Sequence, residues 1–124
     1  MLFLKLIGLI ILSYLIGSIT FGDIVARIKK VDLRSQGSGS VGATNVFRVI
    51  GKGWGAAVLV GDALKGVVAV WLGSLIGKIH GFDPAIITGI MAIIGHSWPV
   101  FMKFKGGKGV ATSLGVVVAL VPMS

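Results

Sequence analysis

The chain has 124 residues, of which 55% are hydrophobic and only 13% charged, and its mean hydropathy is +1.00. Soluble domains carry about twice that share of charge, which argues against a water-soluble globule. The absence of cysteine excludes disulfides and thiol nucleophiles, and two histidines with four acidic residues leave little for a metal centre. In such a hydrophobic chain, we expect a net charge of +8 to set the orientation in the membrane and to attract an anionic partner, more than to bind nucleic acid. We therefore expect a membrane protein without metal or cofactor.

Four apolar stretches predict an all-α bundle of transmembrane helices, because one span needs about 20 apolar residues. The predicted spans cover residues 3–26, 54–77, 84–102 and 109–124. The fourth is short and has no polar tail, so we expect a single membrane domain, 1–124, that is cut near the far side of this span. A cleavable signal peptide is the alternative for the first stretch. Its basic cluster, however, lies after the apolar core, where a signal peptide does not need it.

Basic residues gather in two of the three connections between these spans. Residues 27–52 hold six Lys and Arg against one Asp, and residues 103–108 hold three Lys and no acid. The connection between the second and third spans has only Lys78 and Asp83. The positive-inside rule then predicts a cytoplasmic first and third connection and an N-terminus outside.

Glycine is too frequent, at 20 residues, to be explained by helix packing alone. Small residues four apart on one helix allow close helix contacts, as we expect for the pair Gly73 and Gly77. Helix packing is the expected role of Gly8, Gly17, Gly61, Gly73, Gly77, Gly89 and Gly115.

The first glycine cluster has a composition suited to an anion. It combines residues that tolerate positive φ with hydroxyl and amide groups, so backbone N–H groups can turn inward around a ligand. Arg48 adds a fork of donors for phosphate oxygens. The candidate residues are Gly37, Ser38, Gly39, Ser40, Gly42, Thr44, Asn45 and Arg48.

Two nucleotide motifs fit this cluster poorly. Residues 37–42 match G-x-G-x-x-G, but that motif needs a preceding strand in a βαβ unit, and here an apolar span and a basic linker precede it. The P-loop pattern fails because Ala43 stands where its lysine is required. A flexible interfacial loop whose Gly and Ser merely suit turns is the remaining alternative.

The second glycine cluster, residues 103–112, surrounds lysines just before the fourth span. Three lysines in six residues could simply set topology. Glycines around a lysine before a helix also let a phosphate approach backbone donors and the positive end of the helix. The candidate phosphate-binding residues are Lys105, Gly106, Gly107, Lys108 and Gly109.

Several ionisable or polar residues fall within or beside the spans. Asp62 and Lys65 are three apart, so we expect them to pair on the bundle interior, either to orient helices or to support a substrate site. His96 is a candidate general base, although a lone intramembrane histidine is more often a packing residue. Thr20 and Asp23 belong either to the interface or to the same polar mouth.

Catalytic motifs for acyl transfer through an enzyme nucleophile are missing. The chain has no G-x-S-x-G elbow, and neither histidine is followed five residues later by Asp. Any acyl transfer must therefore use a substrate that is already activated.

Four motifs together resemble the integral-membrane glycerol-3-phosphate acyltransferases of bacteria that use acyl phosphate as donor. They are Gly-Ser-Gly-x-x-Gly-Ala-Thr-Asn at 37–45 with Arg48, Asp-x-x-Lys-Gly at 62–66, Gly-His-x-x-Pro-Val-Phe at 95–101, and Phe-Lys-Gly-Gly-Lys-Gly-Val-Ala-Thr at 104–112. Ser40 departs from the pattern, which usually has Asn there. Members typically have seven spans, and their third cytoplasmic motif follows the fourth span, so about four of seven spans are expected here.

The resemblance implies transfer of an acyl group from acyl phosphate to the C1 hydroxyl of glycerol 3-phosphate, which gives lysophosphatidic acid and phosphate and begins phospholipid synthesis. It implies catalytic roles for Ser38, Arg48 and His96, with phosphate bound by the first loop and by Gly106 to Thr112. It also implies a multi-pass protein of the bacterial inner membrane, in contact with lipid. A small transporter or channel for phosphorylated anions and an inactive fragment of the acyltransferase are the alternatives.

Overall fold

The computed structural model describes residues 2–77, 83–100 and 110–121, and every regular element in these ranges is a helix. This confirms the expected all-α bundle. In chain order the elements are α1 (Leu2–Gly17), α2 (Phe21–Lys29), the 3-10 helix η1 (Leu33–Ser35), α3 (Ala43–Val49), α4 (Lys52–Ser74), α5 (Pro84–Ser97) and α6 (Val110–Leu120).

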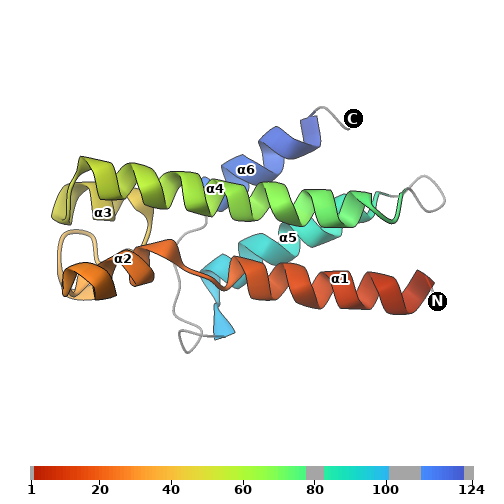
Figure 1. The fold of residues 1–124 in the computed structure, drawn as a ribbon, viewed down its shortest axis with the longest axis horizontal. Coiled ribbons are helices and arrows are strands. Elements are labelled where there is room, and N and C mark those ends of the chain that lie inside the picture. The colour runs from red at the N-terminus through yellow and green to blue at the C-terminus, as the bar shows by residue number, and fades with distance from the viewer. Residues whose placement is uncertain (1, 78–82, 101–109, 122–124) are drawn as a thin grey trace.

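The long helix α4 is the central element of the bundle. It has 23 residues and packs against α1, α2, α3, α5 and α6. Figure 1 shows α1 and α2 lying end to end along α4, with α2, η1 and α3 at one end of the molecule and the N-terminus at the other. The first basic connection therefore lies far from the end at which α4 leads into α5.

The first helix is shorter than expected, because the predicted helix over 3–26 is divided into α1 and α2. Between them, Ser18 to Thr20 leave the helical conformation, and Thr20 is extended with φ −95° and ψ 106°. The contacts of this break, described with the site below, explain why the chain leaves the helix there.

Helix length separates two candidate spans from two shorter apolar helices. By length and composition, the stretch Leu2–Lys29 and helix α4 are long enough to cross a membrane. Helices α5 and α6 are also apolar, but they have 14 and 11 residues. At 1.5 Å per residue these correspond to roughly 21 Å and 17 Å, less than the roughly 30 Å of a bilayer core.

Glycines allow the backbones of crossing helices to touch. A Cβ on Gly115 of α6 would lie 2.7 Å from the carbonyl carbon of Ala63 in α4, and one on Gly66 would meet the carbonyl oxygen of Thr112. The expected packing role is confirmed for Gly17, Gly61, Gly73, Gly89 and Gly115.

Two of the expected packing glycines behave differently. Gly77 lies beyond the end of α4 with a φ of +79°, so the predicted Gly73–Gly77 pair does not form on one helix. A Cβ on Gly8 would meet none of the described residues within 4 Å. Sequence spacing alone could not show where α4 ends.

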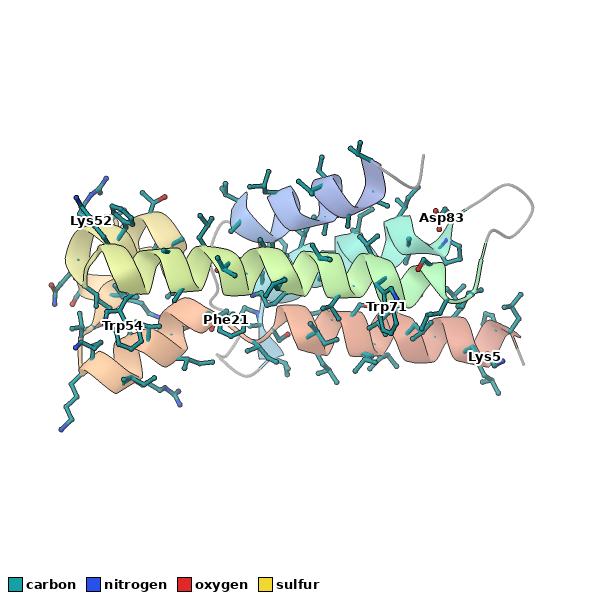
Figure 2. All side chains as sticks on the ribbon, turned by 45° about the horizontal axis from the view of Figure 1, so that its top comes forward. Lys5, Phe21, Lys52, Trp54, Trp71 and Asp83 are labelled. Atoms are coloured by element: carbon teal, nitrogen blue, oxygen red, sulfur yellow. The ribbon has the colours of Figure 1, made fainter. Side chains whose placement is uncertain are left out.

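The tryptophans lie at the ends of helices with exposed rings. Figure 2 shows Trp54 near the start of α4 and Trp71 near its end, with Lys5 and Asp83 toward the same end of the bundle as Trp71. Their exposed fractions are 38% for Trp54 and 57% for Trp71. Exposed tryptophans near the two ends of a long apolar helix are typical of aromatics at a membrane interface.

We predict that Gly115→Ala and Gly8→Ala have opposite effects on stability. The added methyl group at 115 meets the α4 backbone and should cost about 1–3 kcal/mol, because a close-packed crossing must open. At 8 the same change adds helix propensity, worth up to about 1 kcal/mol, without a clash. Thermal unfolding in detergent, followed by circular dichroism, measures both variants. A rise in melting temperature for Gly115→Ala would contradict the close contact.

Candidate functional site

A cavity of about 360 Å³ lies where the first glycine loop meets α3, α4, α5 and the start of α6. Residues from four segments that are distant in the sequence line it. They are Ser38, Ser40, Gly42, Ala43, Thr44, Asn45, Arg48, Leu59, Asp62, His96, Val110 and Ala111.

The loop on one side of this cavity is held in shape by the buried side chain of Asn45. Its Oδ1 accepts a hydrogen bond from the backbone N–H of Ser38 at 3.1 Å. Its Nδ2 donates to the carbonyl oxygens of Ser40 at 2.8 Å, Gln36 at 3.1 Å and Leu33 at 3.3 Å. Asn45 was expected to bind phosphate, but both the oxygen and the nitrogen of its amide bond the backbone of the loop. Its side chain therefore holds the loop in shape.

Glycines and a serine complete the turn. Gly37 and Gly39 adopt φ values of +56° and +77°, and a Cβ on Gly37 would collide with Oδ1 of Asn45. Ser40 Oγ accepts a hydrogen bond from the backbone N–H of Gly42 at 3.0 Å, just before α3 begins. An asparagine at 40 could accept the same bond through its side-chain oxygen, so the departure from the family pattern preserves this turn.

Helix α3, which was expected to be part of a connection, presents Thr44 and Arg48 to the cavity. The two side chains are exposed, four residues apart and therefore on one helical face. The opposite face carries the fully buried Val46, which packs in a core with Leu33 and Val58. Among the described acidic residues none forms an ion pair with Arg48, so its guanidinium fork is available to an anion.

The deep wall of the cavity contains two ionisable groups backed by a third. Asp62 and His96 line the cavity, and Lys65 lies behind them; all three are at most 4% exposed. Lys65 Nζ lies 3.0 Å from Asp62 Oδ1 and 2.8 Å from His96 Nδ1. The expected Asp62–Lys65 pair is confirmed, and His96 joins it from α5.

Lys65 also binds the break between α1 and α2. Its Nζ donates to the carbonyl oxygens of Gly17 at 3.0 Å and Ile19 at 2.7 Å. These carbonyl groups are released from helical bonding at the break, and unsatisfied carbonyls in an apolar bundle are costly. The buried ammonium group explains why the chain can leave the helix at this point.

Thr20 and Asp23, left open between two roles, form a separate polar cluster beside the site. Thr20 Oγ1 donates to Asp23 Oδ2 at 2.7 Å, and Arg34 Nη2 lies 3.1 Å from the same oxygen. This cluster fastens η1 to α2. Neither residue lines the cavity.

The candidate residues of the sequence thus fall into three groups. The cavity lining includes Ser38, Ser40, Gly42, Thr44, Asn45, Arg48, Asp62 and His96. Lys65 supports it from behind, and Gly37 and Gly39 shape the loop without lining the cavity. Thr112 is fully buried with its backbone against Gly66 of α4, and the lining does not include it. The remaining candidates, Lys105, Gly106, Gly107, Lys108 and Gly109, lie outside the described residues.

Some lining residues were not expected from the sequence. Leu59 lies three residues before Asp62 and therefore on the same face of α4, a signal that helical spacing could have supplied. Val110 and Ala111, which fall within the stretch 106–112 that the family resemblance implied, bring the first turn of α6 to the cavity wall. No cluster of three or more His, Asp or Glu that could hold a metal occurs in the described ranges.

Comparison with known sequences gives one consistent result. The glycerol-3-phosphate acyltransferase family model matches residues 7–124. Curated relatives with that name are 51% identical over 122 residues in Desulforudis audaxviator (strain MP104C) and 50% identical over 121 residues in Aquifex aeolicus (strain VF5). The matches cover 98% and 96% of this chain but 60% and 62% of those relatives, so the chain spans about three fifths of their length.

Comparison with solved structures agrees. The crystal structure of PlsY, an integral membrane glycerol 3-phosphate acyltransferase, in its glycerol 3-phosphate form matches with a TM-score of 0.87 and 48% identity, over 95% of this chain and 58% of that one. Its lysophosphatidic acid form matches with a TM-score of 0.82 and 47% identity, with the same coverage. The fold is therefore that of an integral membrane protein. In sequence and in helix arrangement alike, this chain belongs to the glycerol-3-phosphate acyltransferase family.

Proposed function

We propose that the chain carries a large part of the active site of a membrane acyltransferase. The reaction transfers an acyl group from acyl phosphate to the C1 hydroxyl of glycerol 3-phosphate and yields lysophosphatidic acid and phosphate, the first step of phospholipid synthesis. The observation that carries this proposal is the cavity, in which Arg48, Thr44 and Ser38 face Asp62 and His96.

The first requirement of this reaction is to hold anions. Arg48 offers parallel donors that match phosphate oxygens, and the hydroxyl group of Thr44 lies on the same face of α3. Ser38 Oγ accepts a hydrogen bond from Ser40 N at 3.4 Å, which leaves the hydroxyl proton of Ser38 for a ligand oxygen. We expect Lys105 and Lys108, with their neighbouring glycines, to hold a second phosphate.

The second requirement is a place for an acyl chain beside the phosphate. An apolar groove of about 390 Å³ runs between α3 and α4 and shares Ala43, Thr44, Arg48 and Leu59 with the cavity. Its other lining residues are Phe47, Gly55 and Ala56. A donor with its phosphate at Arg48 could therefore lay its acyl chain along this groove.

The chemistry then needs alignment more than an enzyme nucleophile. The C1 hydroxyl oxygen attacks the acyl carbon, the bond from that carbon to the phosphate oxygen breaks, and phosphate leaves with its electron pair. The hydroxyl proton passes to a phosphate oxygen. Because phosphate is a good leaving group, no acyl-enzyme is required, and holding two anions together is the main task of the protein.

We predict that Arg48→Lys, made in a full-length version, is nearly as damaging as Arg48→Ala. A point charge replaces a bidentate fork, and the loss of about 1.5–3 kcal/mol corresponds to a roughly ten- to hundredfold lower kcat/KM. Turnover at saturating substrate should fall, and KM should rise. Lys52→Ala removes an exposed charge outside the cavity lining and serves as the control, with activity within about twofold of the parent. Near-normal turnover with lysine at 48 would show that the bidentate geometry of arginine is not required.

We propose that the protein lies in the bacterial inner membrane with its N-terminus outside and both glycine-rich loops in the cytoplasm. Because the chain has no cysteine, single cysteines at Ser35 and Ser74 are unique labels on opposite sides. In intact cells an impermeant maleimide should label position 74, and it should label position 35 only after permeabilisation. External labelling at 35 would show the opposite orientation.

We predict that residues 1–124, expressed alone, insert into membranes and bind phosphate weakly but form little lysophosphatidic acid. Alignment of two reactants supplies on the order of 7–11 kcal/mol and tolerates displacements of only about 1 Å. Radiolabelled glycerol 3-phosphate with acyl phosphate measures product for this chain and for one restored to full length. If residues 1–124 formed product at a tenth of the rate of the full-length chain, the third cytoplasmic motif of the family would be dispensable. Binding without product in the full-length protein would favour an anion transporter.

A further inference from the structure

We propose that Lys65 is a positioning residue that holds His96 in the tautomer with its proton on Nε2, so that His96 donates a hydrogen bond into the cavity and does not act as a base. The inference starts from the groups around one buried ammonium group. Its three hydrogen-bond partners are the carbonyl oxygens of Gly17 and Ile19 and Nδ1 of His96, and Oδ1 of Asp62 forms an ion pair with it at 3.0 Å.

The donor and acceptor roles in this cluster follow from chemistry. A lysine ammonium has three donors and no acceptor, and a backbone carbonyl oxygen can only accept. A proton on Nδ1 of His96 would therefore point at another donor across 2.8 Å. The ring avoids this repulsion when Nδ1 accepts and the single proton of the neutral imidazole lies on Nε2.

Contacts between α1 and the end of α5 hold the segment that carries His96. The hydroxyl of Tyr14 donates to the carbonyl oxygen of Trp98 at 2.6 Å, and Ser18 Oγ accepts from the backbone N–H of Val100 at 3.4 Å. These bonds fasten the segment that follows α5 to the last turn of α1 and to the first residue of the break. Gly95, the neighbour of His96, allows this approach, because a Cβ there would collide with the carbonyl oxygen of Tyr14.

The aromatic ring of Phe21 covers another side of Lys65, with its centroid 5.9 Å from Nζ. Figure 2 shows Phe21 beside α4 at the junction of α1 and α2. With Nδ1 directed toward Lys65 and His96 part of the cavity lining, Nε2 is the ring nitrogen left for the cavity. No hydrogen bond joins Nε2 to another residue within the described part of the chain.

The tautomer has a consequence for catalysis, which rests on the proposed function. A neutral histidine that already carries its proton on Nε2 cannot accept the proton of the C1 hydroxyl at that nitrogen. It can donate to an oxygen of a phosphate or of the acyl carbonyl. His96 then stabilises an anionic ligand, and the hydroxyl proton goes to phosphate.

The experiment measures the tautomer directly in the chain of 124 residues, reconstituted in lipid bilayers with ¹⁵N-labelled histidine. His80 is the only other histidine, so His80→Gln leaves a single labelled ring. Long-range ¹H–¹⁵N correlation spectra should show an unprotonated Nδ1 and a protonated Nε2. A proton on Nδ1 would overturn the proposal, because it would mean an uncharged Lys65 that accepts from His96.

A matched variant tests whether Lys65 causes the effect. Lys65→Met combined with Asp62→Asn removes both charges and nearly conserves volume, which avoids an unpaired buried ion. We expect the spectrum to change from one tautomer to a mixture of two. If the variant keeps a pure Nε2–H tautomer, Lys65 is not the positioning residue. The spectrum of the parent chain still decides the tautomer if the variant fails to fold.

Adding glycerol 3-phosphate separates this inference from the proposed function. We expect the Nε2 resonance to shift with the ligand while Nδ1 stays nearly constant. The expected tautomer without a ligand shift would support the positioning role of Lys65 and contradict the use of His96 in substrate binding. Sodium sulfate at equal ionic strength is the control for general salt effects.

Discussion

The buried ammonium group of Lys65 is the constraint on which the bundle depends. A buried charge is tolerated only if its donors are satisfied, and here the acceptors come from α1, the α1–α2 break and α5, while α4 supplies the paired carboxylate. The break in turn depends on the charge, because the carbonyl groups of Gly17 and Ile19 need donors. Without the ammonium group, the two carbonyl groups would be unsatisfied in an apolar interior, and without the carbonyl groups the ammonium group would be. The two features therefore exist together.

Small residues make this arrangement sterically possible. Gly17 and Gly95 let α1 and α5 touch through their backbones, and a Cβ on Gly17 would collide with the carbonyl oxygen of Ala92. Larger residues would push α5 outward and carry His96 away from Lys65. The contacts of Lys65 and the glycine contacts thus lie at the same level of the bundle. Close packing of the helices brings the acceptors within reach, and the ammonium group of Lys65 joins them.

The sequence allowed the helical bundle and the local Asp62–Lys65 pair to be predicted, because hydropathy and helical spacing are properties of neighbouring residues. It did not show that His96 joins the pair from 31 residues away, since that contact depends on how α4 and α5 pack. Helix α3 was missed for a similar reason. Seven residues beginning after Gly42 have little helical stability alone, and the burial of Val46 supplies it.

Every hydrogen bond of the Asn45 side chain goes to the main chain of the loop and not to another side chain. The bonds of Asn45 therefore use atoms that any residue other than proline would supply at these loop positions. The hydroxyl groups of Ser38 and Ser40 add bonds to Ser40 N and Gly42 N, so substitution there changes what the cavity presents and these two bonds, while the bonds of Asn45 remain. Ligand preference in such a site can diversify by single substitutions, while Asn45 itself has no substitute of the same shape and bonding.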